Sequence, residues 1–124
     1  MGLAVAGCVH THFTRTTGLV VPARAPHCHL DVVFQGAPSD PYVVLGGVAT
    51  NSSAPALLVF GETDVAAMRR LTEQACTVGA QGLMNVALNT QLVWAGRGRW
   101  KSTAGTAWAF IYVDPLGRPL APHQ

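Results

Sequence analysis

The segment that most constrains this fold runs from Thr63 to Ala80 (TDVAAMRRLTEQACTVGA), the clearest amphipathic helix in the chain. Its apolar residues recur at spacings of three and four, which places them on one stripe: Val65, Met68, Leu71, Ala75 and Val78. Thr63 or Asp64 supplies a side-chain oxygen for an N-terminal cap, and Gly79 and Gly82 favour a chain reversal. Because so short a helix needs tertiary packing, we expect the stripe to lie on a sheet.

Four segments are predicted to be strands: 28–35, 42–49, 83–94 and 100–113. The first and third alternate with period two, and in the third the even-numbered positions from Met84 to Trp94 are expected on one face. The Gly46-Gly47 pair indicates a bulge or a close backbone approach. The expected fold is a single α+β domain of order β-β-α-β-β, with a mostly antiparallel four-stranded sheet and the helix packed on one face.

A chain of 124 residues fits one domain with additional flanking length. Residues 1–26 are interpreted as an N-terminal segment and flexible tether, because they are rich in Thr and Pro without periodicity. Residues 27–114 form the α+β domain, and 115–124 a Pro-rich tail. Residues 51–55 are expected to be a loop, and the apolar run 56–60 is either a strand extension or the approach to the helix.

The overall charge excludes some partners. Charged residues make up only 11% of the chain, and the formal net charge is +2. This charge is too weak to predict binding to nucleic acid.

No apolar run approaches the ~18 residues that span a bilayer.

The N-terminal stretch LAVAGC resembles a bacterial lipobox, with Val5, Ala6 and Gly7 before Cys8. In that family, a signal peptidase cuts before the cysteine, whose thiol carries a diacylglycerol anchor. Only seven residues precede Cys8, which is shorter than a complete signal peptide. The alternatives are a start codon placed too late and an accidental match. The resemblance implies lipidation at Cys8 and membrane attachment through that lipid.

Three cysteines leave one over if two of them pair. Cys28 is expected on the core face of the first strand, and Cys76 on or beside the buried side of the helix. If the helix packs over that strand, the two come within disulfide distance. The alternative is a pair of buried free thiols.

The domain from Cys28 to Val113 resembles the RcsF-like and YbjQ-like small α+β proteins of bacterial envelopes. The matching features, in order, are CHLDVVF, PYVVLGGVA, a helix ending in A-C-x-x-G-A, and Gly105-Thr106-Ala107. RcsF-like proteins are outer-membrane lipoproteins, stabilised by disulfides, that sense envelope stress through protein contacts. The resemblance implies a non-catalytic module at the outer membrane, facing the periplasm, that contacts envelope proteins. YbjQ-like proteins form rings, so self-association is a second implied contact.

His27-Cys28-His29 is the candidate metal-ligand cluster, and on a strand His27 and His29 would share one face. A further ligand would have to come from His10, His12 or His123. Two ligands do not complete a site, so solvent-facing histidines are the competing interpretation. Three tryptophans and two hairpin arginines are candidate contact residues: Trp94, Trp100, Trp108, Arg97 and Arg99. Core packing for the tryptophans and a solvated turn for GRGRW are the alternatives.

No catalytic motif is found. The six acidic residues fall mostly at turns and helix ends, and nucleophile-elbow, phosphate-loop and zinc-protease motifs are absent. We therefore expect no enzyme activity and no cofactor. The predicted function is that of an envelope lipoprotein acting through protein contacts, with a role in sensing or assembly. The alternative is a small-ligand or metal-binding module that uses His27, His29 and the tryptophans.

Overall fold

The computed structural model describes residues 8–55, 62–95 and 98–121. In this part of the chain, five strands and one helix follow one another in the order β-β-β-α-β-β. Their bounds are β1 Cys8–Arg15, β2 Asp31–Val33, β3 Tyr42–Pro55, α1 Glu62–Thr77, β4 Gly82–Ala95 and β5 Gly98–Tyr112. The predicted α+β class is therefore present, with one strand more than expected.

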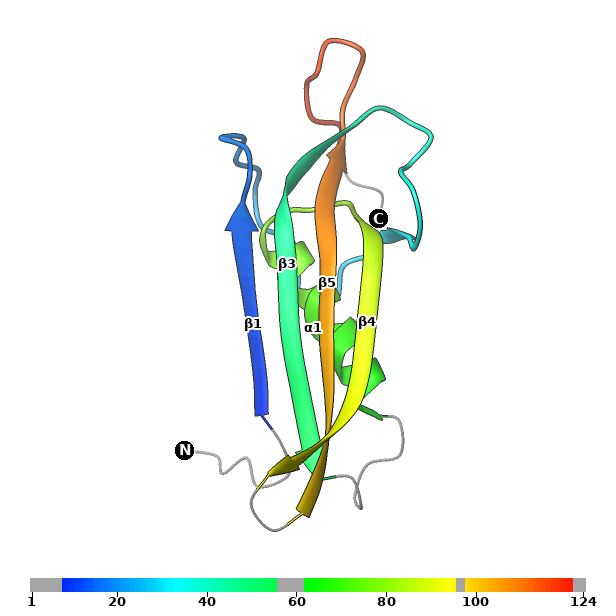
Figure 1. The fold of residues 1–124 in the computed structure, drawn as a ribbon. Helices are drawn as coiled ribbons and strands as arrows, with labels where there is room; N and C mark the ends of the chain where they lie inside the picture. The colour runs from blue at the N-terminus through cyan, green and yellow to red at the C-terminus, as the bar shows by residue number, and fades with distance from the viewer. Residues whose placement is uncertain (1–7, 56–61, 96–97, 122–124) are drawn as a thin grey trace.

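The strands form one sheet in the order β1-β3-β5-β4-β2. Figure 1 shows α1 lying across one face of this sheet, as predicted. The sheet is mixed, because β2 runs parallel to β4 while the other neighbours are antiparallel. Strands β2 and β4 run in the same direction because both start beside the C-terminal end of α1. There the backbone N–H of Asp31 donates to the carbonyl of Gln81 (3.1 Å).

Strand β1 shows that the prediction of a flexible tether over residues 1–26 was wrong for residues 8–15. The strand pairs with β3 along its whole length. Thr11 Oγ1 lies 3.1 Å from Thr50 Oγ1, and Phe13 packs against the hydrophobic core. The segment is ordered because the edge of β3 offers it backbone partners and an apolar face, which its own composition does not reveal.

Residues 16–26 also belong to the domain, because Arg24 ties them to the C-terminal end of α1. Its backbone N–H donates to the carbonyl of Cys76 (2.8 Å), and its guanidinium donates to the carbonyl of Ala80 (2.8 Å). The last carbonyls of a helix lack helical partners, and a cation beside them also offsets the negative end of the helix dipole. Leu19 and Val21 pack against the core. The residues that remain of the predicted tether, 1–7, lie outside the described part of the chain.

The helix buries a stripe centred on Leu71, which is fully buried together with Ala67, Ala75 and Cys76. Val65 was predicted on this stripe, but its side chain is 66% exposed. The reason is helical geometry: six residues correspond to about 600°, so Val65 lies roughly 120° around the helix from Leu71. Gly79 ends the helix in the left-handed conformation (φ 87°), as the sequence predicted.

A bulge in β4 changes which residues of this strand share a face. Met84 pairs with Trp108, but the pairing resumes only at Ala87 with Thr106, so the register shifts between them. Asn85 adopts φ 51° within the shift. Met84 therefore lies on the face opposite the helix, whereas Leu88 lies on the helix face beside Gly105. The predicted single face from Met84 to Trp94 is wrong, because an inserted residue exchanges the two faces of a strand.

Strand β3 is longer than predicted, because residues 51–55 continue it opposite β5. Its register shifts between Val44 and Gly46, which places the expected bulge next to the Gly46-Gly47 pair. The undecided run 56–60 lies outside the described residues. The C-terminal tail turns back, so that Val113 and Pro119 form an isolated antiparallel bridge and the Gln81 side chain donates to the Leu120 carbonyl (2.6 Å).

Candidate interaction surface

Over the described residues of β1, β3, β5 and β4, the face of the sheet opposite α1, called the open face below, lacks acidic residues, lysine and arginine, and several of its residues are small. Residues directly opposite each other in a sheet share a face. Four such rows cross β1, β3, β5 and β4 in that order: Thr14–Gly47–Trp108–Met84, His12–Ala49–Thr106–Ala87, His10–Asn51–Ala104–Asn89 and Cys8–Ser53–Ser102–Gln91. These rows contain no Asp, Glu, Lys or Arg. The Ser102 hydroxyl donates to Asn51 Oδ1 across the face (3.1 Å).

The open face carries a hollow of about 320 Å³ beside Trp108. It is lined by His12, Thr14, Thr16, Gly47, Val48, Ala49, Asn85, Thr106, Ala107 and Trp108. Small residues of the central strands β3 and β5 form its floor, and side chains of β1 together with Trp108 form its walls. The volume falls at the small end of the range found for ligand sites.

Trp108 is held flat against the sheet by the glycine opposite it. A Cβ placed on Gly47 would lie 3.4 Å from Cζ3 of Trp108, which shows that the six-membered ring covers this glycine. The indole is nevertheless 44% exposed, so Trp108 does not belong to the buried core. A flat apolar ring with one face accessible suits binding to another flat molecule.

Asn85 reaches the hollow from the bulge in β4. Its Oδ1 accepts a hydrogen bond from the backbone N–H of Gly36 (3.1 Å), which fixes the plane of the amide. Its Nδ2 has no hydrogen-bond partner within the part of the chain that the structure describes. Asparagine tolerates the left-handed backbone better than most residues, which explains its presence at the bulge. Sequence analysis missed Asn85 and His12, because neither the bulge nor β1 was recognised.

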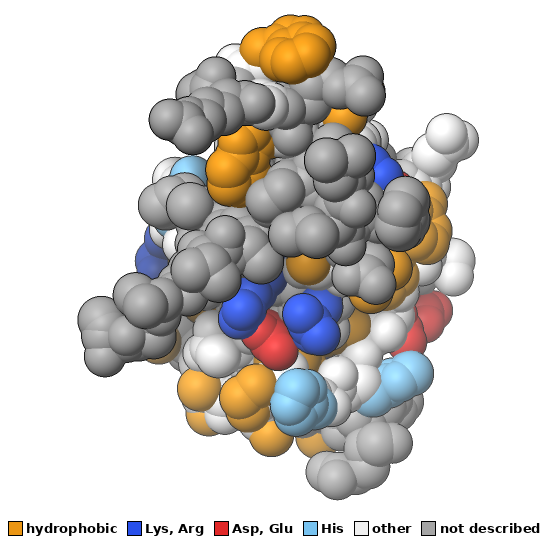
Figure 2. All heavy atoms as spheres, turned by 90° about the horizontal axis from the view of Figure 1, so that it is seen from below, with side chains coloured by type: hydrophobic (Ala, Val, Ile, Leu, Met, Phe, Trp, Pro, Cys, Tyr) orange, Lys and Arg blue, Asp and Glu red, His pale blue; other side chains and the backbone are white. Residues whose placement is uncertain are grey.

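A second exposed region, called the hairpin end below, is formed by the β4–β5 ribbon beyond the helix. The helix cover ends near Thr90 and Thr103, whose hydroxyls donate to Asp64 Oδ1 (2.7 and 3.2 Å). Beyond this point, Leu92 and Trp94 are 55% and 78% exposed. Figure 2 views the molecule from this end and shows hydrophobic side chains at its surface.

Of the five predicted contact residues, Trp94 and Trp108 lie on the two surfaces described above. Trp94 lies at the hairpin end opposite Arg99, and Lys101 lies opposite Leu92. Trp100 is half-buried on β5. Trp108 belongs to the open face. Arg97 lies outside the described residues, and of Arg99 only the backbone is described.

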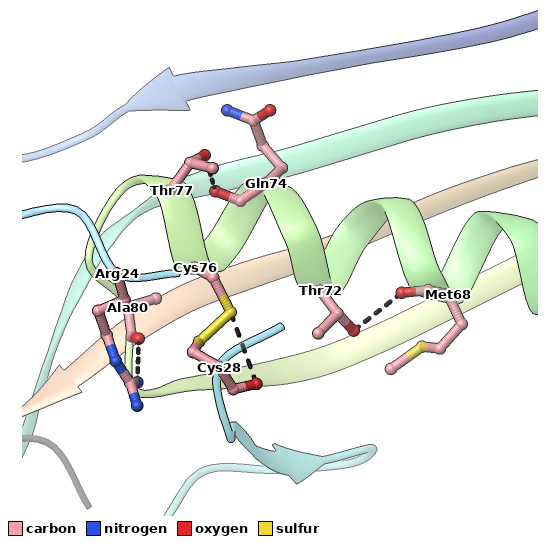
Figure 3. Close-up of a disulfide and its surroundings, with 8 residues drawn as sticks. All are labelled: Arg24, Cys28, Met68, Thr72, Gln74, Cys76, Thr77 and Ala80. Carbon is pink, nitrogen blue, oxygen red and sulfur yellow. Dashed lines mark hydrogen bonds between the residues drawn. A yellow bond between two sulfur atoms is a disulfide. The ribbon is translucent and has the colours of Figure 1, made fainter. Parts of the chain in front are cut away.

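Cys28 and Cys76 form a disulfide with Cα atoms 5.9 Å apart, as the sequence predicted. Cys28 does not lie on a strand, however. It follows a turn in which its N–H donates to the carbonyl of Ala25 (3.0 Å), and β2 starts only at Asp31. Figure 3 shows the bridge joining the last turn of α1 to this turn, next to the hydrogen bond between Arg24 and Ala80.

The histidine pair does not form the predicted arrangement, because residues 26–30 are turn and coil and not strand. His29 Nε2 lies 3.5 Å from Asp31 Oδ1, and His27 borders a shallow depression beside Val65 and Met68 on the helix. Among the described residues, no group of three or more His, Cys, Asp and Glu is arranged to hold a metal ion. No described helix is long and apolar enough to span a membrane.

Asp31 accepts a hydrogen bond from the Tyr112 hydroxyl (2.7 Å). Burial of the phenol, together with the bond to this carboxylate, raises the pKa of Tyr112 from 10.0 to about 12. Because the folded pKa is above the unfolded one, the resulting stability is complete below about pH 10 and disappears as the pH rises to about 12.

We therefore expect the free energy of unfolding to fall between about pH 10 and pH 12, and Tyr112→Phe to show a smaller fall. Denaturant titrations across this range measure it. Tyr42→Phe, a tyrosine on the neighbouring strand, is the matched control. Identical pH profiles for the wild type and Tyr112→Phe would refute the assignment.

Comparison with known proteins establishes the fold of this chain. No protein-family model and no curated protein matches it. Among solved structures, it is similar to a protein of unknown function from the DUF74 family of Pediococcus pentosaceus ATCC 25745 (TM-score 0.55, 16% identity, 67% of this chain and 97% of that one). It is also similar to the Francisella virulence factor FvfA (TM-score 0.54, 14% identity, 80% of this chain and 96% of that one). At these identities, the likeness concerns the α+β fold alone.

Proposed function

We propose that this protein is an exported, lipid-anchored module of the bacterial envelope that acts through protein contacts and not through catalysis. The observation that carries the proposal is the Cys28–Cys76 disulfide, because structural disulfides persist in oxidising compartments outside the cytosol. The third cysteine, Cys8, is then left for the acyl chain that its lipobox-like context implies. The RcsF-like sequence features support the same assignment.

The position of Cys8 in the sheet determines how such an anchor would hold the domain. Cys8 starts β1 and lies in one row with Ser53, Ser102 and Gln91. Trp94 is three residues further along β4, which corresponds to about 10 Å. Because β1 is part of the sheet, an anchor on Cys8 would keep the hairpin end next to the bilayer surface.

The hairpin end is the surface we assign to protein contacts. Leu92 and Trp94 expose apolar area there, and Lys101 lies beside them. Tryptophan and arginine are enriched in protein interfaces, where an apolar centre is surrounded by a polar rim.

Metabolic labelling of the complete gene product with an alkyne fatty acid in a bacterial host tests the anchor. We expect label on the wild type and none on Cys8→Ser, with the wild type alone in the membrane fraction. A wild-type protein that stays unlabelled and soluble after export would exclude the lipoprotein assignment.

Photo-crosslinking in intact cells tests the contact surface. A benzoylphenylalanine at position 94 should give discrete adducts with an envelope protein or a second copy of this chain. The same group at Leu116, which is 77% exposed at the opposite end of the sheet, is the matched control. Equal adducts from both positions would rule out the hairpin end as the contact surface.

A further inference from the structure

The hollow beside Trp108 has no carboxylate, ammonium or guanidinium group in its lining, because none of the ten described residues that line it is Asp, Glu, Lys or Arg. Phosphates, carboxylates and ammonium groups are bound through opposite charges, which form the strong hydrogen bonds of such sites. The hollow therefore suits a neutral ligand.

The polar groups around the hollow match a ligand that is rich in hydroxyls. Thr14 and Thr106 carry hydroxyls that both donate and accept, the His12 ring offers two nitrogens, and Asn85 contributes its two Nδ2 donors. These groups come from three different strands and surround a floor of Gly47 and Ala49. A hydroxyl also donates and accepts, so each of these side chains has a complementary partner on a sugar.

Trp108 supplies the remaining element of a saccharide site, a flat apolar surface. The C–H groups on one side of a pyranose ring form an apolar face that stacks on an aromatic ring. The indole of Trp108 is fixed over Gly47 and keeps one face accessible. We propose that the hollow binds a neutral oligosaccharide, with one sugar ring stacked on Trp108 and its hydroxyls bonded to His12, Asn85 and Thr106.

The open face continues beyond the hollow in a way that favours a chain of sugars over a single one. The next two rows contain Asn51, Asn89, Gln91 and Ser102 around the small Ala104, again without charge. Two rows are four residues along each strand, or about 13 Å. Further sugar rings would extend along this polar track. The inference does not rest on the lipid anchor, although Cys8 starts the last of these rows on β1, nor on contacts at the hairpin end, which lies past these rows.

Isothermal titration calorimetry of the Cys8→Ser chain with maltotetraose, cellotetraose and chitotetraose tests the proposal. At least one of these neutral tetrasaccharides should bind, and Trp108→Ala should weaken the affinity about tenfold. Asn85→Asp keeps the acceptor for Gly36 but removes the Nδ2 donors, and it should weaken binding as well. Trp94→Ala is the matched control, because it removes a larger exposed area outside the hollow and should leave the affinity unchanged.

Thermal unfolding of each variant ensures that lost binding does not reflect lost folding. The proposal is overturned if none of the three sugars binds at millimolar concentration, or if Trp94→Ala weakens binding as much as Trp108→Ala. It is also overturned if sedimentation shows a dimer that Trp108→Ala dissociates, since a second copy of the chain would then occupy the open face. The proposal is likewise overturned if a charged oligosaccharide binds to the hollow more tightly than the neutral ones.

Discussion

Cys28→Ala/Cys76→Ala in a Cys8→Ser background is expected to lower the free energy of unfolding by about 4 kcal/mol. The disulfide joins residues 48 positions apart, so it removes much of the conformational freedom of the unfolded chain. It also fastens the turn before β2 to the last turn of α1, next to the hydrogen bonds of Arg24 with Cys76 and Ala80. Denaturant unfolding with and without a reductant measures the effect.

The reductant provides the internal control for this prediction. It should destabilise the Cys8→Ser chain by a similar amount and leave the double-alanine variant unchanged, because the latter has no disulfide to reduce. Equal stability of the oxidised and reduced chains would contradict a structural role for the bridge. That result would also remove the main support for export of the protein.

Leu71→Ala is expected to destabilise the domain by about 3 to 5 kcal/mol, at the upper end of the range for buried leucines. Leu71 is fully buried at the centre of the contact between α1 and the sheet. A Cβ placed on Gly105 beneath it would lie 3.2 Å from its Cδ1, so the leucine covers a residue without a side chain. Gly105 has no side chain that can move into the cavity, so relaxation is left to neighbours such as Leu88 and Thr50, which border the same glycine.

Val65→Ala is the matched control for Leu71→Ala, since it truncates an apolar residue of the same helix. Its side chain is 66% exposed, so we expect a change within about 0.5 kcal/mol. Thermal and denaturant unfolding of the two variants measure the difference. Similar losses for both would contradict the placement of the buried stripe on Leu71.

The hairpin formed by β4 and β5 illustrates what could be predicted from local sequence. Alternation of apolar and polar residues with a glycine-containing turn between them located both strands to within two residues of their observed ends. The same pattern could not reveal the bulge at Asn85, because a bulge inserts a residue without changing composition. The two faces of β4 were therefore assigned incorrectly beyond Met84.

Prediction of the candidate sites from local sequence has the same limitation. Trp94 and Trp108 stood out as tryptophans, but only their surroundings distinguish the hairpin end from the hollow. His12 became part of the hollow because β1 pairs with β3, and Thr16 lines it just beyond that strand. A short segment rich in Thr and His reads as linker when it is considered alone, since β-propensity depends on the neighbouring strand.

The sequence by itself determined the amphipathic helix and the α+β class, because both follow from local periodicity. For Cys28 and Cys76 it left a disulfide and free thiols as alternatives, and the tertiary structure decided between them. The tertiary structure decided the fifth strand, the parallel edge and the residues that share the open face. These features depend on hydrogen bonds and contacts between segments far apart in the chain, and such contacts leave no periodic trace in either segment.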